Sequence, residues 1–295
     1  MQRITDHKIT VKGIEAALDS CTPEFIGRIA GGLSLTAMHN CLTGGNMCPS
    51  EQLEIRALTG FYAPIDSFQQ EMREYGKLEL DALRKSTICL RNDIDESATE
   101  IIHRLESLVD GYVDSVHVWS SCRTPSWVPL LEGRKVLVVS AFAETMKQQW
   151  PKRHLLHTTN PSSTLNFKFP EFDVSFVKAP LTLTGCEPFK HKSWHSAYAE
   201  LCDEVDKQSF DVALLSCGAY AQPLGGHIFD QGGKSWCVGG ILQTVFGIRG
   251  HRWSRITSNV SNSYNEHWTK PSESETPRNF RECRPDWDIF WEVDS

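Results

Sequence analysis

Two turns built from small residues follow apolar runs and precede helical patterns, which suits them to holding a charged ligand. The first turn follows residues 211–216 and consists of Cys217, Gly218, Ala219 and Tyr220. The second turn follows residues 235–238 and consists of Gly239 and Gly240. In a parallel sheet both turns lie at one edge, and the helices after them direct N-terminal N–H groups at that edge. We expect the pair to hold the phosphates of a nucleotide. For either turn alone, close packing of helix against strand is the favoured explanation.

Basic and aromatic residues follow the second turn. Arg249 and Arg252 each offer a planar fork that matches a phosphate, although a solvated loop is an equal alternative. Asn265 and Trp268 could cover a sugar or a base, because aromatic faces stack on such rings. Anchoring in the core is the slightly favoured interpretation of these two residues.

Acidic residues supply candidates for proton transfer and for metal binding. Glu144 begins a helical pattern after an apolar strand. It could act as a general base or a metal ligand, or equally as a first-turn acid favoured by the helix dipole. Two Asp-x-Asp pairs, Asp93/Asp95 and Asp286/Asp288, could hold Mn²⁺ or Mg²⁺ on a diphosphate. Such pairs more often lie on the surface.

Cys217 supports a different chemistry. A cysteine on a sharp turn between strand and helix is similar to a nucleophile elbow, in which backbone N–H groups form an oxyanion hole. His227, Glu144 or His195 would have to supply the base. The elbow pattern also requires glycine two positions earlier, where this chain has Leu215. We therefore rank a cysteine-dependent hydrolase or amidotransferase below the nucleotide interpretation.

The elements that position these residues alternate between strand and helix. The pattern predicts strands over residues 113–119, 135–140, 172–178, 211–216 and 235–238, and helices over 142–150, 195–207, 221–229 and 241–246. This order, with continuous apolar strands, indicates an α/β fold with a Rossmann-like, mostly parallel sheet covered by helices. Ligands of such sheets bind at the carboxyl ends of strands.

The part before residue 113 is predicted to be mainly helical. Helical spacing extends over residues 65–90 and resumes over 98–108. Residues 25–29 form a short apolar run of strand type, followed by Gly31-Gly32 and a helical pattern, an order that suits a turn facing phosphate. We expect three parts: a mainly helical part at 1–112, a Rossmann-like core at 113–250 and a tail at 251–295 that wraps the sheet.

Composition excludes several classes of protein. The chain has 295 residues, of which 40% are hydrophobic, and a net charge of −7. Nucleic-acid binding is disfavoured, because no cluster of Lys and Arg offers a basic face. None of the ten cysteines forms a Cys-x-x-Cys pair, so a zinc ribbon is not expected. No apolar run approaches the ~20 residues of a membrane span or forms a signal peptide, so we expect a cytoplasmic protein.

Residues 211–252 resemble uncharacterised bacterial proteins related to GT-D-type glycosyltransferases. The resemblance rests on Leu-Ser-Cys-Gly-Ala-Tyr, then Gly-Gly-Ile-Leu-Gln, which ends at Gln243, and Phe-Gly-Ile-Arg-Gly-His-Arg-Trp. Residues 138–144 and 264–272 carry weaker similarities, to a strand followed by Pro-Phe-Ala-Glu and to a tail with Asn-Glu-x-Trp and Pro-Ser. Altogether the similarity covers residues 135–278 well and the N-terminal half loosely.

The resemblance implies an enzyme that transfers a sugar from a nucleotide-sugar donor to a glycan acceptor during the biosynthesis of surface polysaccharides. Glu144 is the candidate for acid/base work. The implied donor-binding residues come from three parts of the chain, namely Arg28, Gly31 and Gly32, then Cys217, Gly218, Ala219, Tyr220, Gly239, Gly240 and Gln243, then Arg249, Arg252, Asn265 and Trp268.

The chain departs from the family at its metal-binding motif. GT-D-type enzymes carry Arg-Phe-Gly-Asp-Gly-Glu near the N-terminus, where the acids bind metal and donor. The matching stretch here is Arg-Ile-Ala-Gly-Gly-Leu, so Gly31 and Leu33 replace the two acids. Three outcomes stay open: another acid that holds Mn²⁺ or Mg²⁺, transfer without metal, or a non-catalytic protein that binds a nucleotide or sugar.

Overall fold

A computed structural model describes most of the chain. The described residues are 2–4, 7–29, 33–91, 111–114, 127–157, 167–183, 190–256, 260, 262–277 and 291.

Eight parallel strands form one sheet in this part of the chain. Their order across the sheet is β1-β4-β3-β2-β8-β7-β5-β6, and every neighbouring pair is parallel. The strands are β1 (Gln2–Ile4), β2 (Glu24–Ile29), β3 (Ile88–Arg91), β4 (Gly111–Asp114), β5 (Lys135–Ser140), β6 (Asp173–Lys178), β7 (Val212–Ser216) and β8 (Lys234–Cys237).

Helices connect the strands and cover the sheet. The α-helices are α1 (His7–Asp19), α2 (Leu33–Thr43), α3 (Pro49–Thr59), α4 (Phe68–Lys85), α7 (Ala143–Gln149), α8 (Trp194–Asp206), α9 (Ala221–Asp230), α10 (Ile241–Val245) and α11 (His251–Ile256). Short 3₁₀ turns are η1 (Ile65–Ser67), η3 (Val128–Leu131), η4 (Trp150–Leu155), η5 (Gly218–Tyr220) and η6 (Glu273–Glu275).

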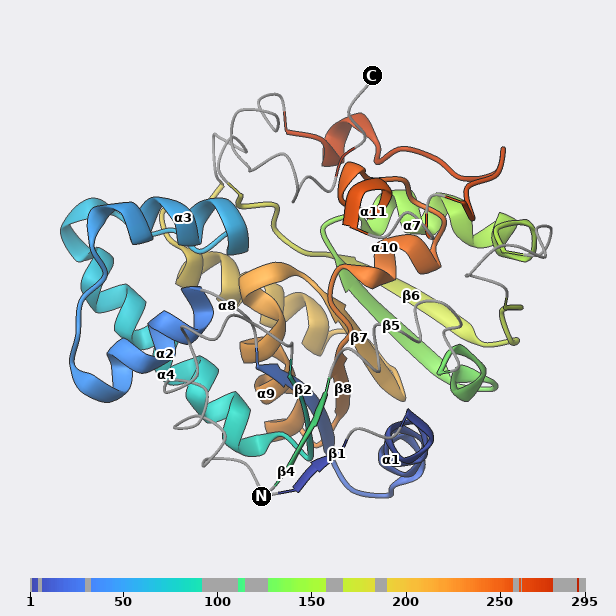
Figure 1. The fold of residues 1–295 in the computed structure, drawn as a ribbon, viewed down its shortest axis with the longest axis horizontal. Coiled ribbons are helices and arrows are strands. Elements are labelled where there is room, and N and C mark those ends of the chain that lie inside the picture. Colours follow the sequence, from blue (N-terminus) through green and yellow to red (C-terminus); the bar gives the residue numbers. More distant parts are fainter. Residues whose placement is uncertain are drawn as a thin grey trace.

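The two faces of the sheet bury two separate cores. In Figure 1, α2, α3 and α4 lie to the left of the strands, whereas α1 lies to the lower right of β8 and α7 lies above β6. The first core joins one face to α1, η3, α7 and α10, and includes Val138, Leu214 and Trp236. The second core joins the other face to α2, α3, α4, α8 and α9, and includes Val139 and Leu215. Alternate residues of β5 and β7 enter different cores, as the period of two in a strand requires.

The structure confirms the predicted α/β class with a Rossmann-like parallel sheet between helices. Strand β5 matches its predicted range, β7 starts one residue inside its range, and β8 is shifted by one residue toward the N-terminus. Predicted strand 25–29 is β2 and lies at the centre of the sheet, beside β8. Of predicted strand 113–119, residues 113–114 belong to β4, and the rest lies outside the described residues, as does predicted helix 98–108.

One long helical prediction is wrong at its end. The pattern over residues 65–90 predicted continuous helix, but α4 ends at Lys85 and strand β3 begins at Ile88. Ser86 takes an extended conformation, and the backbone N–H of Thr87 donates to the Phe25 carbonyl at 2.8 Å. Residues 88–90 have an apolar spacing that fits both helix and strand, and pairing with the sheet decides in favour of the strand.

Among the described residues, none of the helices combines the length and the apolar character that a membrane span requires.

Candidate functional site

The connections that follow four neighbouring strands alternate between the two faces of the sheet, an arrangement that favours ligand binding at their carboxyl ends. Helix α7 after β5 and α10 after β8 pack in the first core, whereas α9 after β7 and α2 after β2 pack in the second core. Neighbouring strands in the order β5-β7-β8-β2 therefore send their connections to opposite faces. Ligands in doubly wound sheets bind where neighbouring connections separate in this way.

Two predicted binding residues meet where β2 and β8 end. Gly239 has a positive φ of 74°, and a Cβ atom added there would lie 2.3 Å from Nη1 of Arg28. The guanidinium group of Arg28 thus lies directly against the backbone of the turn after β8. Arg28 and Gly239 are half-buried, as is Gly240. We call these three residues, at the carboxyl ends of two adjacent strands, the β2–β8 edge.

The turn at residues 217–220 packs against Thr59 and Thr182. Gly218 has a φ of 58°, and a Cβ atom there would lie 2.6 Å from the carbonyl oxygen of Thr59. Ala219 and Tyr220 are buried. The Tyr220 hydroxyl lies 3.1 Å from Oγ1 of Thr182, which donates to the Gly60 carbonyl at 2.6 Å. Close packing with the segment after α3 therefore accounts for the small residues of this turn.

The thiol of Cys217 is poorly placed to act as a nucleophile. It is buried, and burial raises the pKa of Cys217, with Cys202 nearby adding to the rise. A nucleophilic cysteine needs the thiolate, which a lowered pKa favours. His227 lies in the last turn of α9 and contacts Asp206 at 2.8 Å, while Nε2 of His195 lies 2.9 Å from the Glu71 carbonyl oxygen. Each candidate histidine thus has a partner other than this cysteine.

Gln243 holds the segment that follows α10. Its Nε2 donates to the Arg249 carbonyl at 3.1 Å, and its Oε1 accepts from Nε1 of Trp253 at 3.0 Å. Gln243 is buried. Nη2 of Arg249 donates to the Asn265 carbonyl at 3.0 Å, and the guanidinium of Arg252 lies 5.5 Å from the ring centre of Trp253. The hydrogen bonds of Gln243 and Arg249 thus connect α10, α11 and the tail.

Asn265 and Trp268 attach the tail to the last residue of η4 and to the residue after it. Nδ2 of Asn265 donates to the carbonyl of Leu155 at 3.0 Å, and Nε1 of Trp268 donates to that of Leu156 at 2.8 Å. Trp268 is buried, and its ring centre lies 4.7 Å from that of Tyr264. The anchoring interpretation accounts for both residues.

Glu144 is exposed in the first turn of α7, with its backbone held by the tail. Its N–H donates to Oε1 of Glu275 at 2.8 Å. The Glu275 carboxylate also accepts from the N–H of Thr145 at 3.2 Å and from Oγ1 of Thr145. A residue more than 130 positions away thereby satisfies the first N–H groups of this helix, where an anion is favoured.

Several predicted site residues lie outside the described part of the chain. These are Gly31 and Gly32 and both Asp-x-Asp pairs, Asp93/Asp95 and Asp286/Asp288. Within the described ranges, no group of three or more His, Cys, Asp and Glu side chains is arranged to hold a metal ion. Arg28, Gly239 and Gly240, the described residues of the β2–β8 edge, carry no carboxylate, thiol or imidazole that would bind a metal ion.

Gln222 and Glu275 are site residues that sequence reasoning missed. Gln222 is buried in the first turn of α9, and its Oε1 accepts the backbone N–H of Arg28 at 2.9 Å. Its place two residues after the Cys-Gly-Ala-Tyr turn was the available signal, because first-turn side chains lie near the strand ends. Nothing local distinguishes Glu275 from the exposed Glu273 beside it.

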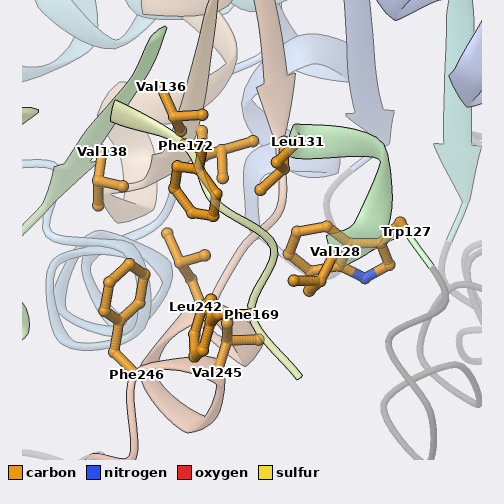
Figure 2. Close-up of a pocket in the computed structure, with 11 residues that line it drawn as sticks. Trp127, Val128, Leu131, Val136, Val138, Phe169, Phe172, Leu242, Val245 and Phe246 are labelled. Atoms are coloured by element: carbon orange, nitrogen blue, oxygen red, sulfur yellow. The ribbon is translucent and has the colours of Figure 1, made fainter. Parts of the chain in front are cut away.

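A small pocket lies within the first core. Figure 2 shows apolar side chains from η3, β5, the segment before β6 and α10 around it. The lining includes Val138, Phe172 and Phe246, and the cavity volume is about 10 Å³. That volume is at the lower limit for one water molecule, and apolar cavities of such size stay dry. The pocket is thus a packing defect between sheet and helix.

Comparisons with protein-family models, curated proteins and solved structures find no match to this chain.

Proposed function

We propose that this protein is a glycosyltransferase-like enzyme that binds the diphosphate of a nucleotide sugar at the β2–β8 edge. The observation that carries the proposal is the contact between the Arg28 guanidinium and the Gly239 turn. It combines a cation that suits phosphate, a turn without side chains and a position where neighbouring connections separate. The sequence resemblance supports the nucleotide-sugar class of donor and a glycan acceptor.

The proposed reaction breaks the bond between the sugar's anomeric carbon and the diphosphate oxygen. An acceptor hydroxyl oxygen forms the new bond to that carbon, and its proton passes to a base, for which Glu144 is our candidate. The diphosphate leaves with the bonding electron pair. Arg28 would stabilise the negative charge that develops on it, which is the electrostatic contribution expected of a fixed cation at a leaving group.

The cysteine-dependent alternative receives less support. Its nucleophile is buried with a raised pKa, and the carbonyl of Thr59, the last residue of α3, packs against the adjoining Gly218. A non-catalytic protein that binds a nucleotide or sugar at the same edge would share every contact described above. Binding and turnover therefore have to be measured separately.

The first test is binding of UDP, GDP, CDP, dTDP and CMP to the full chain by isothermal titration calorimetry, each with and without Mn²⁺. We expect one nucleoside diphosphate to bind, and the effect of Mn²⁺ reports whether the chain uses a metal. Release of nucleoside diphosphate from the matching nucleotide sugars then tests turnover. Binding without release under any metal would identify the non-catalytic alternative, and no binding at saturating concentrations would refute the proposal.

Substitution of Arg28 locates the ligand. We expect Arg28→Ala to weaken binding of the diphosphate about 10- to 100-fold, the usual effect of losing a hydrogen bond to a charged group. Arg84→Ala removes the same charge from an exposed position on α4 and should leave the affinity unchanged. Equal affinities of the two variants would place the ligand elsewhere.

A further inference from the structure

Gln222 links α9 to the ends of two central strands. It is only 6% exposed, and its Oε1 accepts the backbone N–H of Arg28 at 2.9 Å. The same oxygen lies 3.7 Å from Sγ of Cys237, the last residue of β8. The amide of Gln222 therefore contacts both β2 and β8 from the second core.

The backbone explains why a side chain is needed at this point. The register of β2 and β8 ends with Ile26 opposite Trp236. Beyond it, the N–H of Gly239 donates to the Leu215 carbonyl of β7 at 3.1 Å, so the chain after β8 turns toward β7. The pairing of β2 with β8 thus ends two residues before Arg28, and the Gln222 oxygen accepts the Arg28 N–H there.

Glycine makes room for this arrangement on β2. A Cβ atom at Gly27 would lie 3.2 Å from Nε2 of Gln222 and 2.1 Å from Oγ of Ser86. The backbone of Arg28 is consequently fixed by Gln222 from one side, while its guanidinium lies against Gly239 on the other. Gly27, Gln222 and Gly239 together thus determine the position of the Arg28 guanidinium.

We propose that Gln222 is a positioning residue, which holds Arg28 in place for the anionic group of the ligand. This inference rests on the proposed function, because it concerns the same edge of the sheet. Its physical basis is the sensitivity of a charge-assisted, planar contact to small displacements of the cation. Without the Gln222 oxygen, the half-buried backbone N–H of Arg28 loses this hydrogen bond, and the end of β2 is free to shift.

A double-mutant cycle tests the proposal in the full chain. The probe is whichever of UDP, GDP, CDP and dTDP binds the unmodified protein most tightly. We expect Gln222→Met, which keeps the side chain's length but removes the acceptor, to weaken binding about tenfold when Arg28 is present. In the Arg28→Ala background the same change should alter the affinity less than twofold. A general loss of structure would weaken binding equally in both backgrounds.

Gln231→Met is the matched control, because it makes the same change at the exposed far end of α9. It should leave the affinity unchanged. Equal loss in both backgrounds, or no loss from Gln222→Met, would overturn the positioning role alone. Absence of binding by the unmodified protein would instead overturn the proposed function, so the two failures are distinguishable.

A second measurement needs no variant and covers the case in which Gln222→Met fails to fold. Hydrogen exchange of the Arg28 amide in the unmodified protein should be slow, and slower still when the same nucleoside diphosphate is saturating. An Arg28 amide that exchanges at the rate of an open loop, or that does not respond to ligand, would contradict the proposal.

Discussion

The carboxylate of Glu275 accepts a hydrogen bond from the backbone N–H of Glu144 at 2.8 Å, although the residues lie 131 positions apart. Glu275 is fully buried. Ser272 also donates to it, through Oγ at 3.0 Å, and the Glu275 carbonyl accepts from Nε1 of Trp291 at 2.7 Å. This acid therefore joins the tail to the first turn of α7, beside the carboxyl end of β5.

Removal of this acid should destabilise the fold. Glu275→Ala leaves the N–H groups of Glu144 and Thr145 and the Thr145 hydroxyl without their acceptor. We expect a loss of about 2 to 4 kcal/mol in the free energy of unfolding, measured by urea denaturation. Glu273→Ala, at an exposed position of the same 3₁₀ turn, should cost less than about 0.5 kcal/mol. Similar losses in the two variants would show that the buried contacts contribute little.

The buried carboxyl group of Glu79 should make the stability of the fold depend on pH. It is 2% exposed on α4, and burial raises its pKa to about 8, against a smaller opposing effect of the hydrogen bond from Tyr75. The folded protein thus keeps the proton that the unfolded chain releases at a pKa near 4.5. The free energy of unfolding should therefore fall as pH rises from about 4.5 to about 8, by roughly 3 kcal/mol at pH 7.

Glu79→Gln should remove that dependence. The amide cannot ionise and still offers an oxygen to the Tyr75 hydroxyl, which lies 2.5 Å from Oε1 of Glu79. We expect the variant to melt higher than the unmodified protein at pH 8 and nearly alike at pH 4.5. Glu74→Gln, at an exposed position of the same helix, should follow the unmodified protein at every pH. Parallel curves for Glu79→Gln would mean that Glu79 is ionised in the fold.

Gly239 and Gly232 separate the effect of backbone strain from that of contact with Arg28. Both have positive φ, 74° and 83°, so alanine costs about 1 to 2 kcal/mol at either position. Only at Gly239 would the new Cβ meet the Arg28 guanidinium, whereas at Gly232 nothing lies within 4 Å. We expect Gly239→Ala to weaken nucleoside diphosphate binding about tenfold and Gly232→Ala to leave it unchanged, by titration calorimetry. If both variants bind the nucleoside diphosphate as tightly as the unmodified protein, the Gly239 turn is not part of the binding site.

Cys217 should be chemically inert in the folded protein. Burial raises its pKa, so at pH 8 little thiolate is present and the sulfur is covered. Cys21 is exposed and serves as the internal reference. Iodoacetamide labelling followed by peptide mass spectrometry should modify Cys21 faster by on the order of 100-fold or more. Labelling of Cys217 at the rate of Cys21 would restore the cysteine-dependent alternative.

The sequence predicted the sheet best where burial is continuous. Within Lys135–Ser140 the four central residues are buried valines and a leucine, and the strand was predicted to the residue. Ile88 illustrates the opposite case, because its spacing also fits α4 and only the neighbouring β2 decides its conformation. Local patterns cannot report a partner that lies distant in the chain.

The same principle governs the candidate site. Arg28 and Gly239, which the resemblance implies as donor-binding residues, lie in contact with each other. The roles of Gln222 and Glu275 depend on contacts 194 and 131 positions away, which no local pattern encodes. Asn265 and Trp268 were assigned to a ligand by similarity, while their hydrogen bonds lead to the end of η4.

The pairing of β2 with β8 also constrains the order of events during synthesis. Glu24 stands opposite Lys234, 210 positions later, at the centre of the sheet. Contacts between such distant residues form late, because closing a long loop precedes any gain from pairing. While the ribosome makes the intervening chain, β2 therefore has an unpaired edge of the kind that promotes aggregation. Expression should improve under conditions that slow misassociation of nascent chains, such as low temperature or added chaperones.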